Sequence, residues 1–222
     1  MHYKIESFLN LNINIIKAFI IFFYLIGAIG LVIPETNSIF IQLIPFALLF
    51  SVCILSLYHK TNSIYKSILL FLLIAIIGYI TEVVGVSTHL IFGNYSYGTG
   101  LGIKLFNTPL LIGINWALLV YFTACIFQKV KINNGLKLLG ASLLMLFYDI
   151  ILEQVAPNID MWSWYNNRIP LQNYIAWFIL AFLFQLLVYK FKLLYNNKIA
   201  ATLFICHLSF FIFIFILNTL IK

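Results

Sequence analysis

Three acidic side chains lie in stretches of the sequence that are otherwise apolar, and these are the residues best suited to chemistry. They are Glu82, Asp149 and Glu153, half of the six acidic residues in the chain. A carboxylate at the middle of a membrane costs roughly 2.5–3.5 kcal/mol on insertion scales. Because of that cost, these three acids are the first candidates for a functional site.

Asp149 and Glu153 are four residues apart, so on a helix their side chains share one face. Two carboxyl groups this close in a low-dielectric site do not ionise together easily, and we expect one of them to hold a proton. A neutral acid beside a carboxylate is a pairing that acid–base catalysis uses. The other interpretations are a metal-binding pair, one step of a proton relay, or a pair hydrated at the membrane interface without a role.

Glu82 is accompanied at helical spacing by small residues, Ala75, Gly78 and Gly85. Small residues allow a second helix to approach closely, so we expect Glu82 to point into a bundle. A purely structural acid, bonded to a neighbouring helix, is the alternative. His89 follows on the same face and is the one histidine near the acids, which is too few for a metal centre, so we predict no metal site.

Two short aromatic runs flank the acidic segments, one around Tyr95 and Tyr97 and the other around Trp162 and Trp164. Aromatic side chains commonly gather at a membrane interface. Alternatively, π faces near a proton-donating acid would stabilise a carbocation by on the order of 2 kcal/mol when desolvated.

The composition identifies a membrane protein, since 64% of the residues are hydrophobic and 9% are charged. We predict an all-α bundle that forms a single integral membrane domain over residues 1–222, because about 20 apolar residues are needed to cross the bilayer. The formal net charge of +7 comes from residues scattered at the span ends, which is typical of membrane topology and not of nucleic-acid binding. The seven predicted spans are Ile15–Ile33, Ile39–Tyr58, Ile64–Val86, Asn107–Phe127, Leu136–Val155, Gln172–Phe191 and Ala200–Ile221.

The basic residues predict an orientation with the N-terminus in the cytoplasm and the C-terminus outside. With that orientation ten lysines lie on the inner side and three basic residues on the outer side, as the positive-inside rule requires. The third and fifth spans then both end on the outer side, where the two long connections also lie. We therefore expect the three acids to share one pocket that admits the tip of an apolar chain.

A weak internal repeat follows the two acidic helices. Pro109-Leu110 precedes Trp116, and Pro170-Leu171 precedes Trp177, each tryptophan standing seven residues after its proline. Both prolines suit the first turn of a helix. The pattern predicts a duplication of a two-helix unit, with chance spacing as the alternative.

Together these residues resemble the membrane carotenoid biosynthesis family, whose members include carotenoid 1,2-hydratases and bisanhydrobacterioruberin hydratases. The resemblance covers about residues 78–180, and Arg168 departs from it because a small residue is expected there. The matching residues are Glu82, Gly85, Phe92, Gly93, Tyr95, Tyr97, Leu101, Gly102, Pro109, Trp116, Asp149, Glu153, Trp162, Trp164, Pro170, Leu171, Asn173 and Trp177.

The resemblance implies an enzyme of the inner cell membrane that adds water to the terminal C=C bond of an acyclic or monocyclic carotenoid, beside other enzymes of carotenoid biosynthesis. Such hydration proceeds by protonation, a tertiary carbocation and capture by water, and requires no cofactor. From the residues we assign Asp149 or Glu153 as the proton donor, and the other of the two or Glu82 as the base. The expected substrate-binding residues are Tyr95, Tyr97, Trp116, Trp162, Trp164, Asn173, Trp177 and His89.

Two other functions fit the same residues. A proton-coupled transporter would use the three acids as a relay, and it would need polar groups that continue toward the inner face. A carotenoid cyclase would form a similar cation but exclude water, so that its product would keep the mass of the substrate.

Overall fold

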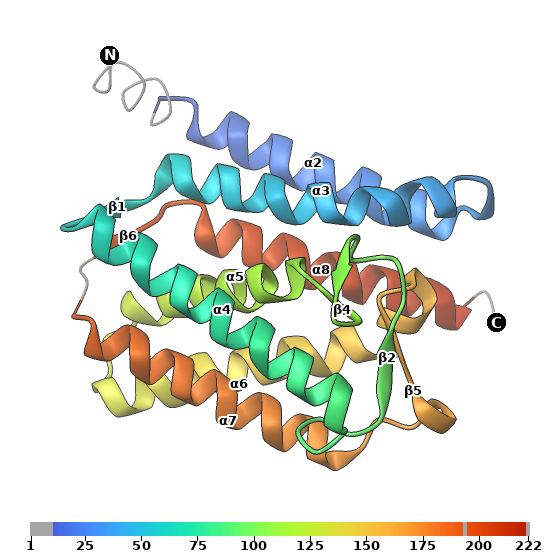
Figure 1. Ribbon diagram of the computed structural model, residues 1–222. Helices are drawn as coiled ribbons and strands as arrows, with labels where there is room; N and C mark the ends of the chain where they lie inside the picture. Colours follow the sequence, from blue (N-terminus) through green and yellow to red (C-terminus); the bar gives the residue numbers. More distant parts are fainter. Residues whose placement is uncertain (1–10, 193–194, 221–222) are drawn as a thin grey trace.

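The computed structural model describes residues 11–192 and 195–220, and within them the fold is a bundle of seven long helices. All seven are long and apolar enough to cross a membrane, which confirms the predicted all-α class; the orientation of the termini stays a prediction. Figure 1 shows the helices side by side, with the two ends of the chain at opposite ends of the bundle. The helices are α2 (Ile13–Val32), α3 (Pro34–Tyr58), α4 (Ile64–Thr88), α5 (Leu111–Gln128), α6 (Asn134–Glu153), α7 (Leu171–Lys190) and α8 (Ala200–Leu220).

Helix α5 is the centre of the bundle. In this helix 67% of the residues are buried, and it packs against α3, α4, α6, α7 and α8. The other six helices bury between 22% and 39% of their apolar windows, so most of their apolar surface faces outward. An apolar outer surface is what a bundle needs in lipid, where helices associate through close packing and polar contacts.

Helices α2 and α3 are joined at the single residue Ile33. Pro34 begins α3, a position where its missing N–H is not needed. The Thr36 hydroxyl donates to the Gly30 carbonyl at 2.8 Å, and the Asn37 amide donates to the Leu31 carbonyl at 2.5 Å. These two side chains satisfy carbonyls that the end of α2 would leave without partners.

Short strands close the ends of the bundle. At the end that carries the acids, β2 (Tyr95–Tyr97) pairs antiparallel with β5 (Trp162–Trp164), and β3 (Lys104–Leu105) pairs with β4 (Thr108–Pro109). At the opposite end β1 (Lys60–Thr61) pairs with β6 (Tyr195–Asn196). Two 3₁₀ turns, η1 (Ala156–Ile159) and η2 (Tyr165–Asn167), flank β5. Figure 1 shows β2 and β5 lying side by side across the helix ends.

The predicted spans agree with the helices to within a few residues, and the largest differences have local causes. The predicted start at Asn107 is wrong because Phe106 and Asn107 both have positive φ and form the tight turn between β3 and β4. Pro109 therefore lies in a strand, and Pro170 caps α7, so neither proline is inside the first helical turn. The second span begins at Pro34 instead of Ile39, and Ile221 lies outside the described residues.

Two helix–strand–helix units are arranged around the β2–β5 pair. The first is α4–β2–α5 and the second is α6–β5–α7, and within each unit the two helices pack together. Ser96 and Ser163 are paired at the centre of the two strands, and Trp116 stacks on Trp177 with ring centroids 4.0 Å apart. These symmetric contacts between equivalent residues agree with the predicted duplication.

Candidate active site

The paired strands β2 and β5 bring four aromatic side chains to the acid end of the bundle. Tyr95 faces Trp164, and Tyr97 faces Trp162, in the antiparallel register. Because neighbouring side chains on a strand point to opposite faces, these four are buried while the serines between them are exposed. The strand pair thus forms an aromatic lid over the acidic helix ends.

The Glu82 carboxylate accepts three hydrogen bonds. The hydroxyls of Tyr95 and Tyr97 each donate to Oε2 at 2.7 Å, and the Trp116 indole donates to Oε1 at 2.9 Å. Trp116 can reach Glu82 because the residue one turn before Glu82 on α4 is Gly78. A Cβ at this position would overlap the Trp116 side chain. The expectation that Glu82 points into the bundle beside small residues is confirmed.

Burial and the Glu82 carboxylate together raise the pKa of Tyr95 and Tyr97 well above the usual tyrosine range, because both factors oppose a phenolate. Both tyrosines lie in β2, outside the membrane-spanning helices. Their hydroxyls therefore remain protonated and serve as donors to the acid.

The Glu153 carboxylate also accepts three hydrogen bonds, but all of them come from N–H groups. The indoles of Trp162 and Trp164 donate to Oε2 at 3.0 and 2.6 Å, and the Asn173 amide donates to Oε1 at 3.0 Å. Indole and amide N–H groups can donate but cannot accept. This donor set therefore suits an ionised carboxylate at Glu153.

Asn173 joins the two acids of α6, since its amide also donates to Asp149 Oδ2 at 3.2 Å. Asp149 is fully buried, and its Oδ1 has no hydrogen-bond partner among the described residues. Asp149 therefore has one acceptor satisfied and one free, whereas both oxygens of Glu153 are occupied. Of the two acids, Asp149 is therefore the one with a carboxyl oxygen that can carry a proton without facing a donor.

A small cavity separates Glu82 from Glu153. Its volume is about 20 Å³, and its walls include both acids, Asn173 and the aromatic lid. A single water molecule needs roughly 10–15 Å³, so the cavity has space for one water and not for the branched end of a hydrocarbon. The expectation of an open pocket for such an end is wrong for this conformation, and a larger molecule can reach the acids only if part of the cavity wall moves.

The remaining predicted site residues take different places. Trp177 lines the cavity between the acids, whereas Trp116 lies behind it, bonded to Glu82 and stacked on Trp177. His89 is exposed at the end of α4 with a positive φ and lies outside the cluster. Asp149 does not reach the cavity wall either, so the structure brings two of the three acids to a shared cavity.

A second contact fixes the long connection after β2. Asp160 Oδ2 accepts from the backbone N–H of Thr99 at 2.7 Å and from its hydroxyl at 2.5 Å. These two bonds lower the pKa of Asp160, since they favour the carboxylate. Gly98 lies against Asp160 so closely that a Cβ would overlap it, which explains a glycine at this point in the connection.

The described residues contain no group of three His, Cys, Asp or Glu side chains arranged as metal ligands would be. What the bundle contains instead is a pair of buried carboxylates, each held by three donors, beneath an aromatic lid. The fold and this site define a helical membrane protein with an acidic centre near one end of its spans.

A family profile gives this class a name. The profile of the carotenoid biosynthesis protein family matches residues 43–222, which is most of the chain, and the chain belongs to that family. The match is longer than the predicted region of about 78–180 and includes most of α3 and all of α8. No curated protein and no solved structure matches the chain.

Proposed function

We propose that this protein hydrates the terminal C=C bond of a carotenoid, and the observation that supports the proposal best is the unequal donor sets of Glu82 and Glu153 across one cavity. Hydration of an alkene needs an acid that gives a proton and a second group that stabilises positive charge. Two carboxyl groups supply both functions when one of them is protonated and the other is ionised. The two donor sets allow the acids to differ.

Glu82 is the proton donor in this proposal. Its partners Tyr95 and Tyr97 carry hydroxyls, which can donate or accept, so they can reorient when the carboxyl group gains or loses a proton. Glu153 cannot change so easily, because its three N–H partners only donate. This assignment differs from the sequence-based one, which gave the donor role to Asp149 or Glu153.

The reaction balances with these residues alone. The Glu82 carboxyl group transfers its proton to the less substituted carbon of the terminal double bond, so that its O–H bond and the π bond break, a C–H bond forms, and a tertiary carbocation results on the neighbouring carbon. The Glu153 carboxylate and the indole and phenol faces of the lid stabilise this cation. Water adds to the cation through its oxygen, and the proton that it then releases returns to Glu82. Asp149 acts as a positioning residue, which keeps a proton and holds Glu153 through Asn173.

The substrate class rests on the family and on the membrane setting. A carotenoid is about as long as the roughly 30 Å hydrocarbon layer is thick, so a molecule lying across the bilayer presents an end group near the depth of the acids. Its apolar chain needs no polar partner on the outward surfaces of the helices.

Expression in a host that makes lycopene tests the proposal. We expect the wild type to give a product heavier by one water, and Glu82→Gln to give none. Glu35→Gln, the same change at an exposed position of α3, is the matched control and should keep wild-type activity. Unchanged pigment, with the wild-type protein present in the membrane, would reject hydration of this substrate. A new product of unchanged mass would favour the cyclase alternative.

A further inference from the structure

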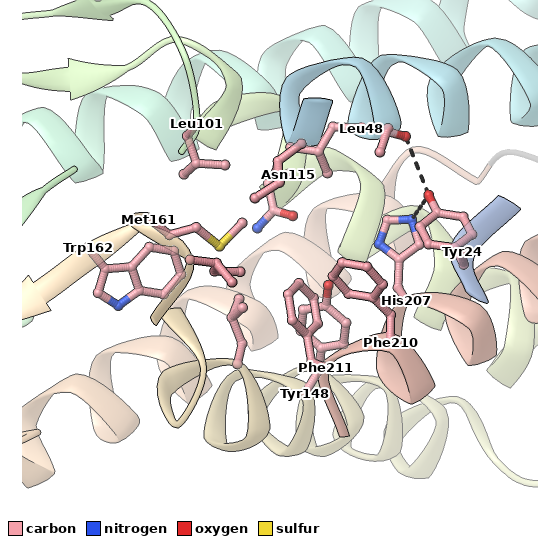
Figure 2. Close-up of a pocket in the computed structure, with 14 residues that line it drawn as sticks. Tyr24, Leu48, Leu101, Asn115, Tyr148, Met161, Trp162, His207, Phe210 and Phe211 are labelled. Carbon is pink, nitrogen blue, oxygen red and sulfur yellow. Dashed lines mark hydrogen bonds between the residues drawn. The ribbon is translucent and has the colours of Figure 1, made fainter. Parts of the chain in front are cut away.

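A second cavity, of about 40 Å³, lies in the middle of the bundle and carries polar groups that the proposed site does not use. Its walls are mostly apolar and include Leu48, Leu152 and Phe211. Besides Tyr24 and Trp162, three polar side chains interrupt these walls, each from a different helix: Asn115 from α5, Tyr148 from α6 and His207 from α8. Figure 2 shows the three of them around the same space.

Two of these polar side chains are buried at the cavity wall. Asn115 is 6% exposed and Tyr148 is 1% exposed, and both line the cavity. Buried polar groups are almost always hydrogen-bonded, so an amide and a hydroxyl at the wall of a cavity favour a molecule inside it that can donate and accept. Both groups therefore suit a small polar molecule in the cavity.

The third polar side chain, His207, is held in place from one side. Its Nε2 lies 2.7 Å from the Tyr24 hydroxyl and 2.9 Å from Ser51 Oγ, and these two oxygens are 2.6 Å apart. Figure 2 shows the other ring nitrogen turned toward the cavity. The three-residue contact with Tyr24 and Ser51 thus orients His207 so that one nitrogen is available to a molecule in the cavity.

The size and chemistry of the cavity select water as this molecule. At roughly 10–15 Å³ for one water, the cavity accommodates about three waters, whereas a branched hydrocarbon end is too large. A buried water makes about three hydrogen bonds, and an amide, a hydroxyl and an imidazole nitrogen supply that number. The apolar remainder of the wall keeps the number of waters small.

The cavity also adjoins the proposed catalytic site. Trp162 lines both cavities, and its indole donates to Glu153. Water that leaves the inner cavity along this side chain arrives beside the carboxylate that faces the cation.

We infer that the cavity lined by Asn115, Tyr148 and His207 stores the water that captures the carbocation; this inference rests on the proposed hydration. The acid site then needs no open channel to bulk water. In this arrangement proton transfer depends on Glu82, and water capture depends on the inner cavity. The two steps can be separated by experiment.

The first experiment addresses the water itself. A map of the wild-type protein at a resolution that shows ordered water should contain density within hydrogen-bond distance of the Asn115 amide and the Tyr148 hydroxyl. An empty cavity in that map would overturn the inference. This result does not depend on activity, so it stands even if the protein fails to hydrate any carotenoid.

The second experiment addresses the role of the water, with carotenoid turnover in D₂O. Protonation by Glu82 places deuterium on the substrate, and a cation that loses a proton instead of gaining water returns as deuterated alkene. We expect Asn115→Leu and Tyr148→Phe to lower the ratio of hydrated product to deuterated alkene at least tenfold. Tyr195→Phe is the matched control, because it removes the hydroxyl of a buried tyrosine in β6 that lines neither cavity.

The outcomes are distinct. Wild-type ratios in both cavity variants would show that the stored water does not feed the reaction. An equal loss of deuterium and of hydrated product in both variants would also overturn the inference, because it would assign the cavity to protonation or substrate binding. If the wild type neither hydrates the substrate nor deuterates it, the proposed function fails, and the water map alone decides whether the site exists.

Discussion

The contrast between the donor sets of Glu82 and Glu153 predicts that the same change, glutamate to glutamine, has different effects on the stability of the protein. A glutamine has one oxygen and one NH₂ group. At position 82 the oxygen can accept from Trp116, and the NH₂ group can donate to the hydroxyls of Tyr95 and Tyr97, which turn to accept. The contacts of Glu82→Gln with these three neighbours can therefore all be remade, and the two hydroxyl protons then lie beside the cavity, which has space for a water that accepts from them.

At position 153 the hydrogen bonds cannot all be remade after the same substitution. The two indole N–H groups can only donate, and the Asn173 amide can accept from a glutamine NH₂ group only by turning its own NH₂ group away from Asp149, so one buried N–H group loses its acceptor. A buried donor left without an acceptor costs about 1–3 kcal/mol. Both substitutions replace one carboxyl group by an amide of the same size, so this cost is the main difference between them. We expect Glu153→Gln to be less stable than Glu82→Gln by about 2 kcal/mol.

Thermal unfolding in one detergent measures this difference. For a chain of this size, about 2 kcal/mol corresponds to a difference of roughly 4–8 °C in Tm. The buried thiols of Cys125 and Cys206 provide the signal, because a thiol-reactive dye labels them as the bundle opens. Glu35→Gln serves as the exposed control. Equal Tm values for the two buried variants, or a lower value for Glu82→Gln, would refute the assigned hydrogen bonds.

Three further predictions test the lid and the connections. Replacing both Ser96 and Ser163 by cysteine should allow a disulfide to form between β2 and β5. Because the cavity beneath these strands is too small for the end of a substrate, the disulfide should abolish turnover until a reductant is added. Activity of the oxidised double variant would contradict movement of the lid. Gly78→Leu should prevent α4 from approaching Trp116 and lower the yield of folded protein, as size-exclusion chromatography would report. Because the pKa of Asp160 is lowered in the folded state, its ionised carboxylate stabilises the fold at pH values above the usual aspartate pKa, and this stabilisation is lost as the pH falls through the lowered pKa. The unfolding free energy of the wild type should therefore exceed that of Asp160→Asn by less below about pH 4 than at neutral pH. A difference that does not change with pH would show that the hydrogen bonds from Thr99 do not cause it.

The sequence predicted the seven spans well because hydropathy alone determines which segments can cross a bilayer. The helix starts at Pro34 and Leu111 were less predictable. They depend on the side-chain contacts that end α2 and on the tight turn at Phe106 and Asn107, which hydropathy does not detect.

The pairing of donors with acids was also beyond the sequence. We expected Tyr95, Tyr97, Trp162 and Trp164 to form a wall around a cation, and the structure shows that they are first of all hydrogen-bond donors to Glu82 and Glu153. A signal for the two strands was present, since Tyr-Ser-Tyr and Trp-Ser-Trp each alternate with the period of a strand.

The inner cavity could not be found in the same way. Tyr24, Asn115, Tyr148 and His207 come from four different helices, and nothing in their spacing relates them. A polar residue within an apolar span is a general signal of function. Only the packing of the helices shows that these four surround the same space.

The register of β2 and β5 has a consequence for the origin of the bundle. A strand that meets a copy of itself across a two-fold axis must pair antiparallel, with one residue opposite its own counterpart, and Ser96 opposite Ser163 has this relation. A single ancestral unit of two helices and a strand could therefore have assembled as a homodimer. Fusion into one chain would then have let each half change its donors separately, so that hydroxyls came to surround one carboxylate and indoles the other.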